Sequence, residues 1–563
     1  MAGAAYSAEV ESSAMTAVIV DVDRASSGPF GSVSARRAYL AGLDRLAGLG
    51  TVERDLVRLG QMPGLARWVE QVKATGGCAH PVYLSGSTTA VDGATGEVVL
   101  RSYSTRGEPG ERLAVRCRNR RASRCASCSY QYAGDTFHLV RAGLAGGKGI
   151  GAGVASHPRA FVTLTAPSFG RVHREGVCRP ARRDVCVHGA PVGCGRVHEA
   201  SDPLVGQPLC AGCYDYTGHV LWHAHAGVLW TRFTDTVYHR LARVGGVGRS
   251  AVRRVVRVSA VKVAEYQRRG AVHFHAVIRL DGPDGPGQAP PGWASAGVLV
   301  EAVRSAAGAV SVPVPESAAY GTRALRFGAQ LDVRALDTPL SDGQMAGYLA
   351  KYVGKSVSVS VGGAGAGSLD RRLVAAGQVR ALRASTHVRA LVGTCWRLGG
   401  LPELQHLRLR AWAHALGYRG HCVTKTRAYS VTYGLLRAER ADHMGARPLA
   451  EAGSDAVVVE RRWRYVSSGH SPAEALVAAG IAADLATERD LARDLRPGWV
   501  GGARRDPGRV GGSWSPGRPL DVDLVVGGGD RATGLAGGVR RGPSRAEGRR
   551  SPGDDPVGDR HGG

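Results

Sequence analysis

Residues 265–280, EYQRRGAVHFHAVIRL, carry two histidines one residue apart in an apolar run, and a glutamate eight residues before the first of them. Side chains of a strand alternate between its two faces, so His273 and His275 would share one face while Phe274 packs on the other. The run therefore predicts a strand with one imidazole-bearing face and one buried apolar face.

A hairpin turn would bring the glutamate to the same face. If residues 268–270 form a three-residue loop, with the glycine in the left-handed conformation that such loops favour, Glu265 pairs with His273. Directly opposed residues share a face of the sheet, so Glu265, His273 and His275 would converge. Two imidazoles and one carboxylate suit a divalent cation with exchangeable positions. The alternative is a hydrogen-bonded pair of histidines on a half-buried strand, and this stretch alone does not separate the two.

Similar patterns flank the hairpin. Residues 157–170, HPRAFVTLTAPSFG, predict a strand that Pro167 ends, and the valine-rich residues 253–267 predict another. Apolar residues at helical spacing over 224–244 predict a helix. Residues 155–360 thus alternate between strand-like and helix-like patterns.

A second polar motif follows in residues 341–357, SDGQMAGYLAKYVGKSV. On a helix, Tyr348 and Tyr352 share one face, with Lys351 and Lys355 close by. A tyrosyl oxygen is a poor nucleophile near neutral pH, but a nearby cation or a metal on the target phosphate makes its attack feasible. Two tyrosines on one face permit two successive transfers. The alternative is an ordinary amphipathic helix with tyrosines at a basic surface.

The composition favours a polyanionic partner. The chain has 563 residues, enough for several domains, and 73 Lys plus Arg against 47 Asp plus Glu give a formal charge of +26. Only six of the basic residues are Lys, and Arg makes forked contacts with phosphate oxygens. A GC-rich genome would explain Arg in place of Lys, but not so large an excess over acids, so we expect nucleic acid as the partner.

No stretch is long and apolar enough to cross a bilayer, and the first residues, MAGAAYSAEVESS, lack the pattern of a signal peptide. These features predict a cytoplasmic protein without a membrane partner. Gly354-Lys355-Ser356 does not complete a nucleotide-binding loop, because position 349 is Leu where that loop needs Gly.

The motifs together resemble a known family. FVTLTAPS, VHFHAVIRL and YLAKY occur in the order of the three motifs of HUH rolling-circle replication initiators, and YLAKYVGK resembles the two-tyrosine variant of some single-stranded DNA phages. The sequence over residues 75–435 resembles the replication initiators of actinobacterial plasmids and integrative elements. Further segments that carry this resemblance are NRRASRCASC, PLCAGCYDY and GAQLDVR.

The resemblance implies roles on the predicted tyrosine helix. Tyr348 matches the nucleophile that forms a 5′-phosphotyrosine link and leaves a 3′-hydroxyl primer, and Tyr352 matches the second tyrosine. Lys351 matches the motif lysine, which orients the attack or offsets charge. The implied partners are single-stranded and hairpin origin DNA, together with a host helicase and polymerase.

The resemblance also implies a metal and a fold. His273 and His275 match the paired metal ligands and Glu265 the third, and they would hold Mg²⁺ or Mn²⁺ on a non-bridging oxygen of the scissile phosphate. The fold class is α+β, a ferredoxin-like palm of antiparallel strands backed by helices, in which residues 161–165 are a structural strand. An insertion of over a hundred residues separates the first two motifs and carries cysteines.

Cysteines are concentrated before the histidine hairpin. Nine of the eleven lie between Cys78 and Cys213, and in a reducing compartment they favour metal or free thiols over disulfides. Two tight Cys-x-x-Cys pairs indicate structural Zn²⁺ in zinc-ribbon modules. The pairs either bind separate ions with local partners or share one ion. We favour two ions, with these ligands: Cys78, Cys117, Cys125 and Cys128 for one, and Cys186, Cys194, Cys210 and Cys213 for the other.

Two of these zinc ligands have alternatives in the sequence. His80 could replace Cys78, and Cys178 could replace Cys186. Buried thiols without a metal are the alternative to either site. Cys395 and Cys422 lie outside the cysteine-rich region and are interpreted as structural.

Composition shifts suggest the domain boundaries. The predicted parts are an N-terminal segment (1–75), a cysteine-rich zinc-binding region that includes the first palm strand at 158–166 (76–215), the endonuclease core (216–360), a linker (361–384), a helical basic C-terminal module (385–445), a helical segment (446–499) and a disordered tail (500–563).

The resulting hypothesis is a metal-dependent endonuclease and strand transferase that initiates rolling-circle replication. The alternatives within the same class are an HUH transposase and a conjugative relaxase. A non-enzymatic zinc-ribbon DNA-binding regulator would use the same charge and cysteines, but it leaves the convergence of Glu265 with the histidines and the paired tyrosines unexplained.

Overall fold

The computed structural model describes residues 49–178, 184–336, 341–355, 357–361, 369–443 and 457–494. The disordered tail predicted for residues 500–563 lies outside these ranges. Within them, no helix combines the length and the apolar character that a bilayer crossing requires.

The central element is a five-stranded antiparallel sheet, which we call the palm. Its strands, in spatial order, are β11 (Leu331–Ala335), β4 (Arg159–Leu164), β8 (Val272–Asp281), β7 (Arg257–Tyr266) and β12 (Val423–Lys425). The strands predicted within residues 157–170 and 253–267 are thereby confirmed as β4 and β7.

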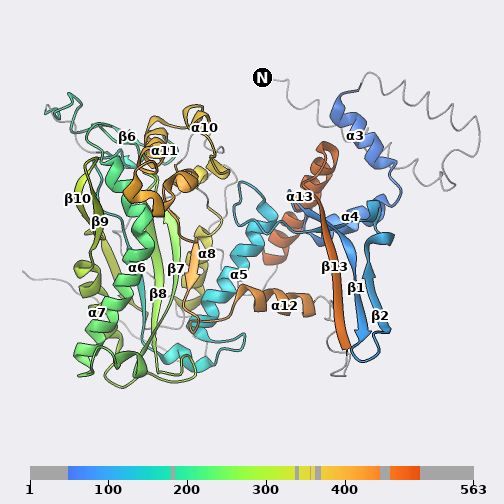
Figure 1. The fold of residues 1–563 in the computed structure, drawn as a ribbon, viewed down its shortest axis with the longest axis horizontal. Coiled ribbons are helices and arrows are strands. Elements are labelled where there is room, and N and C mark those ends of the chain that lie inside the picture. The colour runs from blue at the N-terminus through green and yellow to red at the C-terminus, as the bar shows by residue number, and fades with distance from the viewer. Residues whose placement is uncertain are drawn as a thin grey trace, which may run out of the picture. The chain divides into compact units, whose positions relative to one another are not determined.

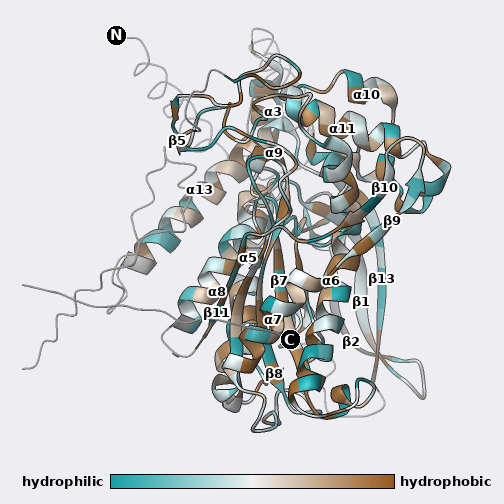
Figure 2. Ribbon diagram, turned by 90° about the vertical axis from the view of Figure 1, so that its left-hand side faces the viewer, coloured by the Kyte–Doolittle hydropathy of each residue, from teal (hydrophilic) through white to brown (hydrophobic). Residues whose placement is uncertain are grey.

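One face of the palm carries the larger apolar core. Helices α6 (Tyr216–Val244) and α7 (Ala296–Ala309) cover it (Figure 1). Alternate side chains of β8 enter this core, with Phe274, Ala276 and Ile278 all buried there. The long apolar stripe of α6 supplies the opposing layer, and Figure 2 shows the hydrophobic residues gathered along β7 and β8.

The other face carries a smaller core and the polar motif. Helices α5 (Ala126–Ala145) and α8 (Ser341–Tyr352) contact each other and pack on this face. Leu349 and Val353 of the tyrosine helix segment are fully buried in this core. His273 and His275 share this face with Val277, because side chains of β8 alternate.

The segment expected as a separate C-terminal module is built into the palm. Strand β12 pairs with β7 at the sheet edge, and Tyr429 is buried in the core on the α8 side. Helix α11 (Thr386–Leu398) buries Leu391 and Val392 against the α6 side. Apolar residues of this segment therefore complete both palm cores. The described part of the predicted linker also folds, with Leu369, Leu373 and Leu382 buried.

The two ends of the described chain form a second sheet. Its strands are β1 (Val82–Asp92), β2 (Val98–Ser104), β3 (Leu113–Val115) and β13 (Val457–Ser468). Helices α3 (Thr51–Gly60), α4 (Leu65–Ala74) and α13 (Pro472–Asp494) share an apolar core around Trp68 and Val72. Residues 446–499, predicted to be helical, thus contain a long strand before their helix, because β13 pairs with β1 along its length.

The remaining elements are short. They are β5 (Gly176–Val177), β6 (Val197–His198), β9 (Val312–Ser317), β10 (Gly321–Leu325), α9 (Val357–Val361), α10 (Ala376–Arg380), α12 (Tyr433–His443) and the 3₁₀ turns Thr105–Gly107, Pro109–Glu111, Ala152–Ser156, Val252–Arg254, Pro402–Leu407 and Leu409–Ala415. The mixture of helices with antiparallel sheets agrees with the predicted α+β class.

Candidate active site

The β7–β8 hairpin brings the predicted metal ligands together. Glu265 pairs with His273 across the two strands, as the three-residue turn predicted. Gly270 has a φ of 77°, the left-handed conformation that favours glycine in such a turn. The predicted register of the hairpin is therefore confirmed.

One carboxylate oxygen faces both imidazoles. Glu265 Oε2 lies 2.8 Å from His273 Nε2 and 3.1 Å from His275 Nε2. One ligand atom from each of the three residues lies within 4.8 Å of the others. Burial would raise the pKa of Glu265, but its hydrogen bonds with the two histidines and the charge of Lys355 outweigh it and hold the pKa well below the usual range. The cluster is a preformed group of one carboxylate and two imidazoles.

Neighbouring side chains orient the two rings. Thr163 Oγ1 on β4 lies 3.2 Å from His275 Nδ1, and Gln267 Nε2 lies 3.5 Å from His273 Nδ1. The Thr163 hydroxyl can accept a hydrogen bond from Nδ1–H, which leaves the lone pair of His275 Nε2 for a cation. The sequence alone assigned neither residue a role in orienting the rings, although Thr163 lies in FVTLTAPS, the first of the three family motifs.

The two tyrosines of α8 face the histidines. Tyr352 stacks on His275 with ring centroids 5.1 Å apart, and Tyr348 meets the same ring edge-on at 5.2 Å. The two tyrosyl rings are 4.9 Å apart. Burial raises the pKa of both hydroxyls, and the hydrogen bond between them partly lowers that of Tyr348 while raising that of Tyr352. The shared helix face predicted from sequence thus points at the cluster of Glu265, His273 and His275.

A lysine one turn further along contacts the cluster. Lys355 Nζ lies 3.0 Å from Glu265 Oε1 and 4.8 Å from the centroid of the Tyr352 ring. Lys351, predicted as the catalytic lysine, is exposed on α8. Lys355 lies three residues after Tyr352. This spacing could have favoured Lys355 over Lys351 as the lysine that contacts the cluster.

A four-cysteine group supports the end of α8. Arg120 Nη1 donates hydrogen bonds to the carbonyls of Val353, at 2.9 Å, and Lys355, at 2.8 Å. Arg120 lies in the loop between Cys117 and Cys125. The thiols of Cys78, Cys117, Cys125 and Cys128 lie within 4.8 Å of one another. These are the first four predicted zinc ligands, and the structure brings them together, while the alternative His80 is exposed.

The cysteine-rich insertion groups its residues differently from the prediction. Cys186, Cys210 and Cys213 gather with His188, whereas Cys194 gathers with His173, Cys178 and His198. Cys194 is therefore not a partner of the other three predicted ligands. The predicted set of four cysteines contained none of these histidines, although His188 and His198 lie in the same stretch of sequence. All eleven cysteines are described, and none forms a disulfide.

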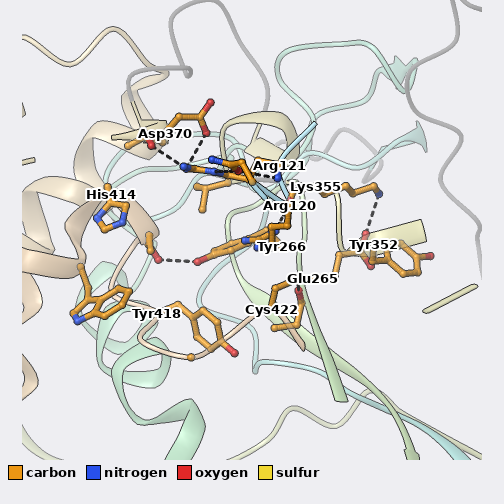
Figure 3. A pocket seen from close by; sticks show the side chains of 17 residues that line it. Arg120, Arg121, Glu265, Tyr266, Tyr352, Lys355, Asp370, His414, Tyr418 and Cys422 are labelled. Atoms are coloured by element: carbon orange, nitrogen blue, oxygen red, sulfur yellow. Dashed lines mark hydrogen bonds and ion pairs between the residues drawn. The ribbon is translucent and has the colours of Figure 1, made fainter. Parts of the chain in front are cut away.

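A cavity of about 340 Å³ opens beside the cluster. Its lining includes Glu265, Tyr352 and Lys355, two arginines from the Cys117–Cys125 loop, and aromatic side chains from the segment before β12 (Figure 3). Of the two arginines, Arg121 Nη1 is held by the carbonyl of Asp370 at 2.9 Å. A basic and aromatic lining is suited to a phosphate with its attached base.

Residues 64–483 match the family described as "Replication initiator protein, pSAM2", and the chain belongs to this family of replication initiators. It is similar to a replication initiator protein of Streptomyces ambofaciens, at 43% identity over 457 residues that cover 78% of this chain and 95% of that protein. No solved structure matches. The resemblance to actinobacterial replication initiators is thereby confirmed.

Proposed function

We propose that this replication initiator nicks single-stranded origin DNA through a tyrosine and so starts rolling-circle replication. The observation that carries the proposal is the convergence of Glu265, His273 and His275 with Tyr348 and Tyr352. A DNA-binding regulator without enzymatic activity would have no use for three largely buried, mutually oriented side chains that face two phenols. Family membership favours an initiator over a transposase or a relaxase.

The residues of the cluster fit a Mg²⁺ or Mn²⁺ ion. Two imidazole nitrogens and one carboxylate oxygen on one side leave the remaining positions of an octahedral ion for water and phosphate oxygens. Glu265, His273 and His275 would hold the ion, with Thr163 fixing the ring of His275. The bound ion would polarise the scissile phosphate and offset the charge that develops on it.

The tyrosine supplies the covalent chemistry. The Tyr348 oxygen attacks phosphorus and loses its proton to solvent, while the bond from phosphorus to the 3′-oxygen breaks. The 3′-oxygen takes up a proton and becomes the primer end, and the 5′-phosphate stays on Tyr348. The motif position assigns this first transfer to Tyr348 and leaves Tyr352 for the second. Lys351 and Lys355 are the candidate cations for the phosphate charge.

The surroundings would bind and support the DNA. The cavity with Arg120, Arg121 and Lys355 would take the nucleotide next to the scissile phosphate. A structural Zn²⁺ on the four thiols around Cys78 would stiffen the loop that holds the end of α8. A host helicase and a host polymerase would supply strand separation and extension.

The test is direct. Full-length protein is incubated with Mn²⁺ and end-labelled single-stranded oligonucleotides tiled across the DNA beside its gene. We expect one oligonucleotide to yield a protein–DNA adduct that survives denaturation, and Tyr348→Phe to lose it. If no oligonucleotide of the tiled region or of any supplied origin forms an adduct with Mg²⁺ or Mn²⁺, while duplex DNA is still bound, the regulator hypothesis replaces the nickase.

A further inference from the structure

The cysteine-rich insertion, residues 171–178 and 184–215, contains two four-residue groups whose members alternate in pairs along the chain. Site A consists of His173, Cys178, Cys194 and His198, and site B consists of Cys186, His188, Cys210 and Cys213. The first and third pairs belong to site A, and the second and fourth belong to site B. We propose that the insertion is a cross-braced module that binds two Zn²⁺ ions, one at each site.

The donor atoms of site A have the spacing of a tetrahedral ion. Zinc bonds to nitrogen and sulfur place neighbouring donors about 3.3–3.8 Å apart. His198 Nε2 lies 3.2 Å from both His173 Nδ1 and Cys194 Sγ, and Cys178 Sγ lies 4.0 Å from His173 Nδ1. The other ring nitrogen of His198 lies 2.6 Å from Asp202 Oδ2. A carboxylate on the far nitrogen is the usual support of a metal-binding histidine.

Site B has a similar spacing with more sulfur. His188 Nδ1 lies 3.2 Å from Cys213 Sγ and 4.0 Å from Cys186 Sγ. A tight turn over residues 186–190 brings the first two ligands, Cys186 and His188, together. The amide of Cys186 closes it by donating to the Ala190 carbonyl at 2.8 Å. Three thiolates and one imidazole around one point are the donor set of a closed structural zinc site.

The module has too little apolar core to fold by burial. Among its described residues 171–178 and 184–215, the buried side chains are Cys178, His198, Val205 and Tyr214. Two of these four belong to site A, and Tyr214 packs in the palm core on the α6 side. Four valines of the module are exposed: Val177, Val185, Val187 and Val197. A short segment of this kind needs metal to offset the entropy of ordering its chain.

The module also contacts the turn of the metal-ligand hairpin. The guanidinium of Arg268, in the β7–β8 turn, donates to the carbonyl of Ala200. A Cβ atom on Gly206 would lie 2.4 Å from the carbonyl carbon of Arg268, so the two backbones touch. The two zinc ions would therefore brace the turn between Glu265 and His273, in addition to folding the insertion.

Zinc analysis of the full-length protein tests the proposal independently of any DNA cleavage. With the thiols around Cys78, the three groups hold nine thiols and three imidazoles. We expect three zinc ions per chain, and X-ray absorption at the zinc edge with an average of three sulfur and one nitrogen ligands. The competing arrangement on eight cysteines would give two zinc ions with sulfur ligands alone. That result, or any content below three after loading and desalting, overturns the cross-brace.

Histidine variants locate the ions. His173→Ala and His188→Ala should each lose at least one zinc, because each removes a ligand that the all-cysteine arrangement does not use. His239→Ala, on an exposed residue of α6, is the matched control and should keep all three. Full zinc content in both ligand variants contradicts the proposal. If either variant fails to fold, the wild-type zinc content and absorption spectrum decide.

Discussion

Lys355 Nζ lies 3.0 Å from Glu265 Oε1, while both histidines contact the other oxygen of the same carboxylate. One side chain is thus shared between the hairpin that would hold a metal and the segment that follows the tyrosine helix. Because of this shared carboxylate, the geometry of the cluster depends on α8 as well as on the β7–β8 hairpin.

Replacing each of the two tyrosines should block a different step of the reaction. Tyr348→Phe should lower adduct formation at least about 100-fold, because the attacking oxygen is gone. Tyr352→Phe should still form the adduct but should not release a joined strand from an oligonucleotide with two nick sites. Denaturing gels of end-labelled DNA separate these products. Normal adduct formation by Tyr348→Phe, together with its loss in Tyr352→Phe, would exchange the two roles.

Removing one metal ligand should separate cleavage from binding. His273→Ala should lower Mn²⁺-dependent nicking about 100-fold or more, since the ion loses one of three protein ligands. Binding of duplex origin DNA, measured by fluorescence anisotropy, should change little. His239→Ala serves as the control histidine. Nicking that continues in excess chelator would remove the metal from the mechanism.

The two lysines of the motif should differ in importance. Lys355→Met should slow nicking roughly tenfold, about 1.4 kcal/mol, because it loses the contact with Glu265 and a positive charge beside Tyr352. Lys351→Met should have the smaller effect, since that side chain is exposed. Single-turnover nicking rates compare them. The opposite order would return the catalytic role to Lys351, as first predicted from the motif.

A buried ion pair stabilises the far end of the hairpin. Asp281 accepts bonds from Arg279 Nε at 2.7 Å, from Ser259 Oγ at 2.6 Å and from the ring of His157, and Arg279 and Asp281 are both fully buried. Asp281→Asn should lower the free energy of unfolding by about 3–5 kcal/mol, because the Arg279 charge loses its partner. Urea denaturation measures the change.

The matched control for that substitution is Asp235→Asn. Asp235 forms an exposed ion pair with Arg253. Its replacement should lower the free energy of unfolding by less than about 1 kcal/mol. Equal losses in the two variants would mean that burial does not set the strength of the Arg279–Asp281 pair.

Acid should weaken the unit formed by the two ends of the described chain, residues 51–115 and 457–494. A forked hydrogen bond from Arg67 lowers the pKa of Glu108 to about 2, from its ordinary value of 4.5. Burial of the carboxyl acts in the opposite direction but is the weaker influence. Its contribution to stability is therefore present above pH 4.5 and is lost as the pH falls toward 2. Glu108→Gln should be less stable than wild type at pH 7, and thermal unfolding should show this gap narrowing between pH 4.5 and 2. A gap that is constant over this range would contradict the assignment.

Local patterns were enough for the hairpin and the tyrosine helix. The alternation around His273 and His275, and the glycine of the turn, fixed which side chains share a face, because strand geometry and the left-handed turn are short-range properties. In the same way, a spacing of four residues put Tyr348 and Tyr352 on one side of a helix.

Only the tertiary structure decided which motifs meet. The sequence did not reveal that β12 closes the palm, that β13 pairs with β1, or that Lys355 contacts Glu265. Nor did it reveal that Cys194 joins the histidines of site A. These contacts link residues far apart in the chain, and they depend on how whole elements pack, which local spacing does not encode. What the sequence determined by itself was the hairpin, the helix and the charge, and the long-range packing assembled them into one site.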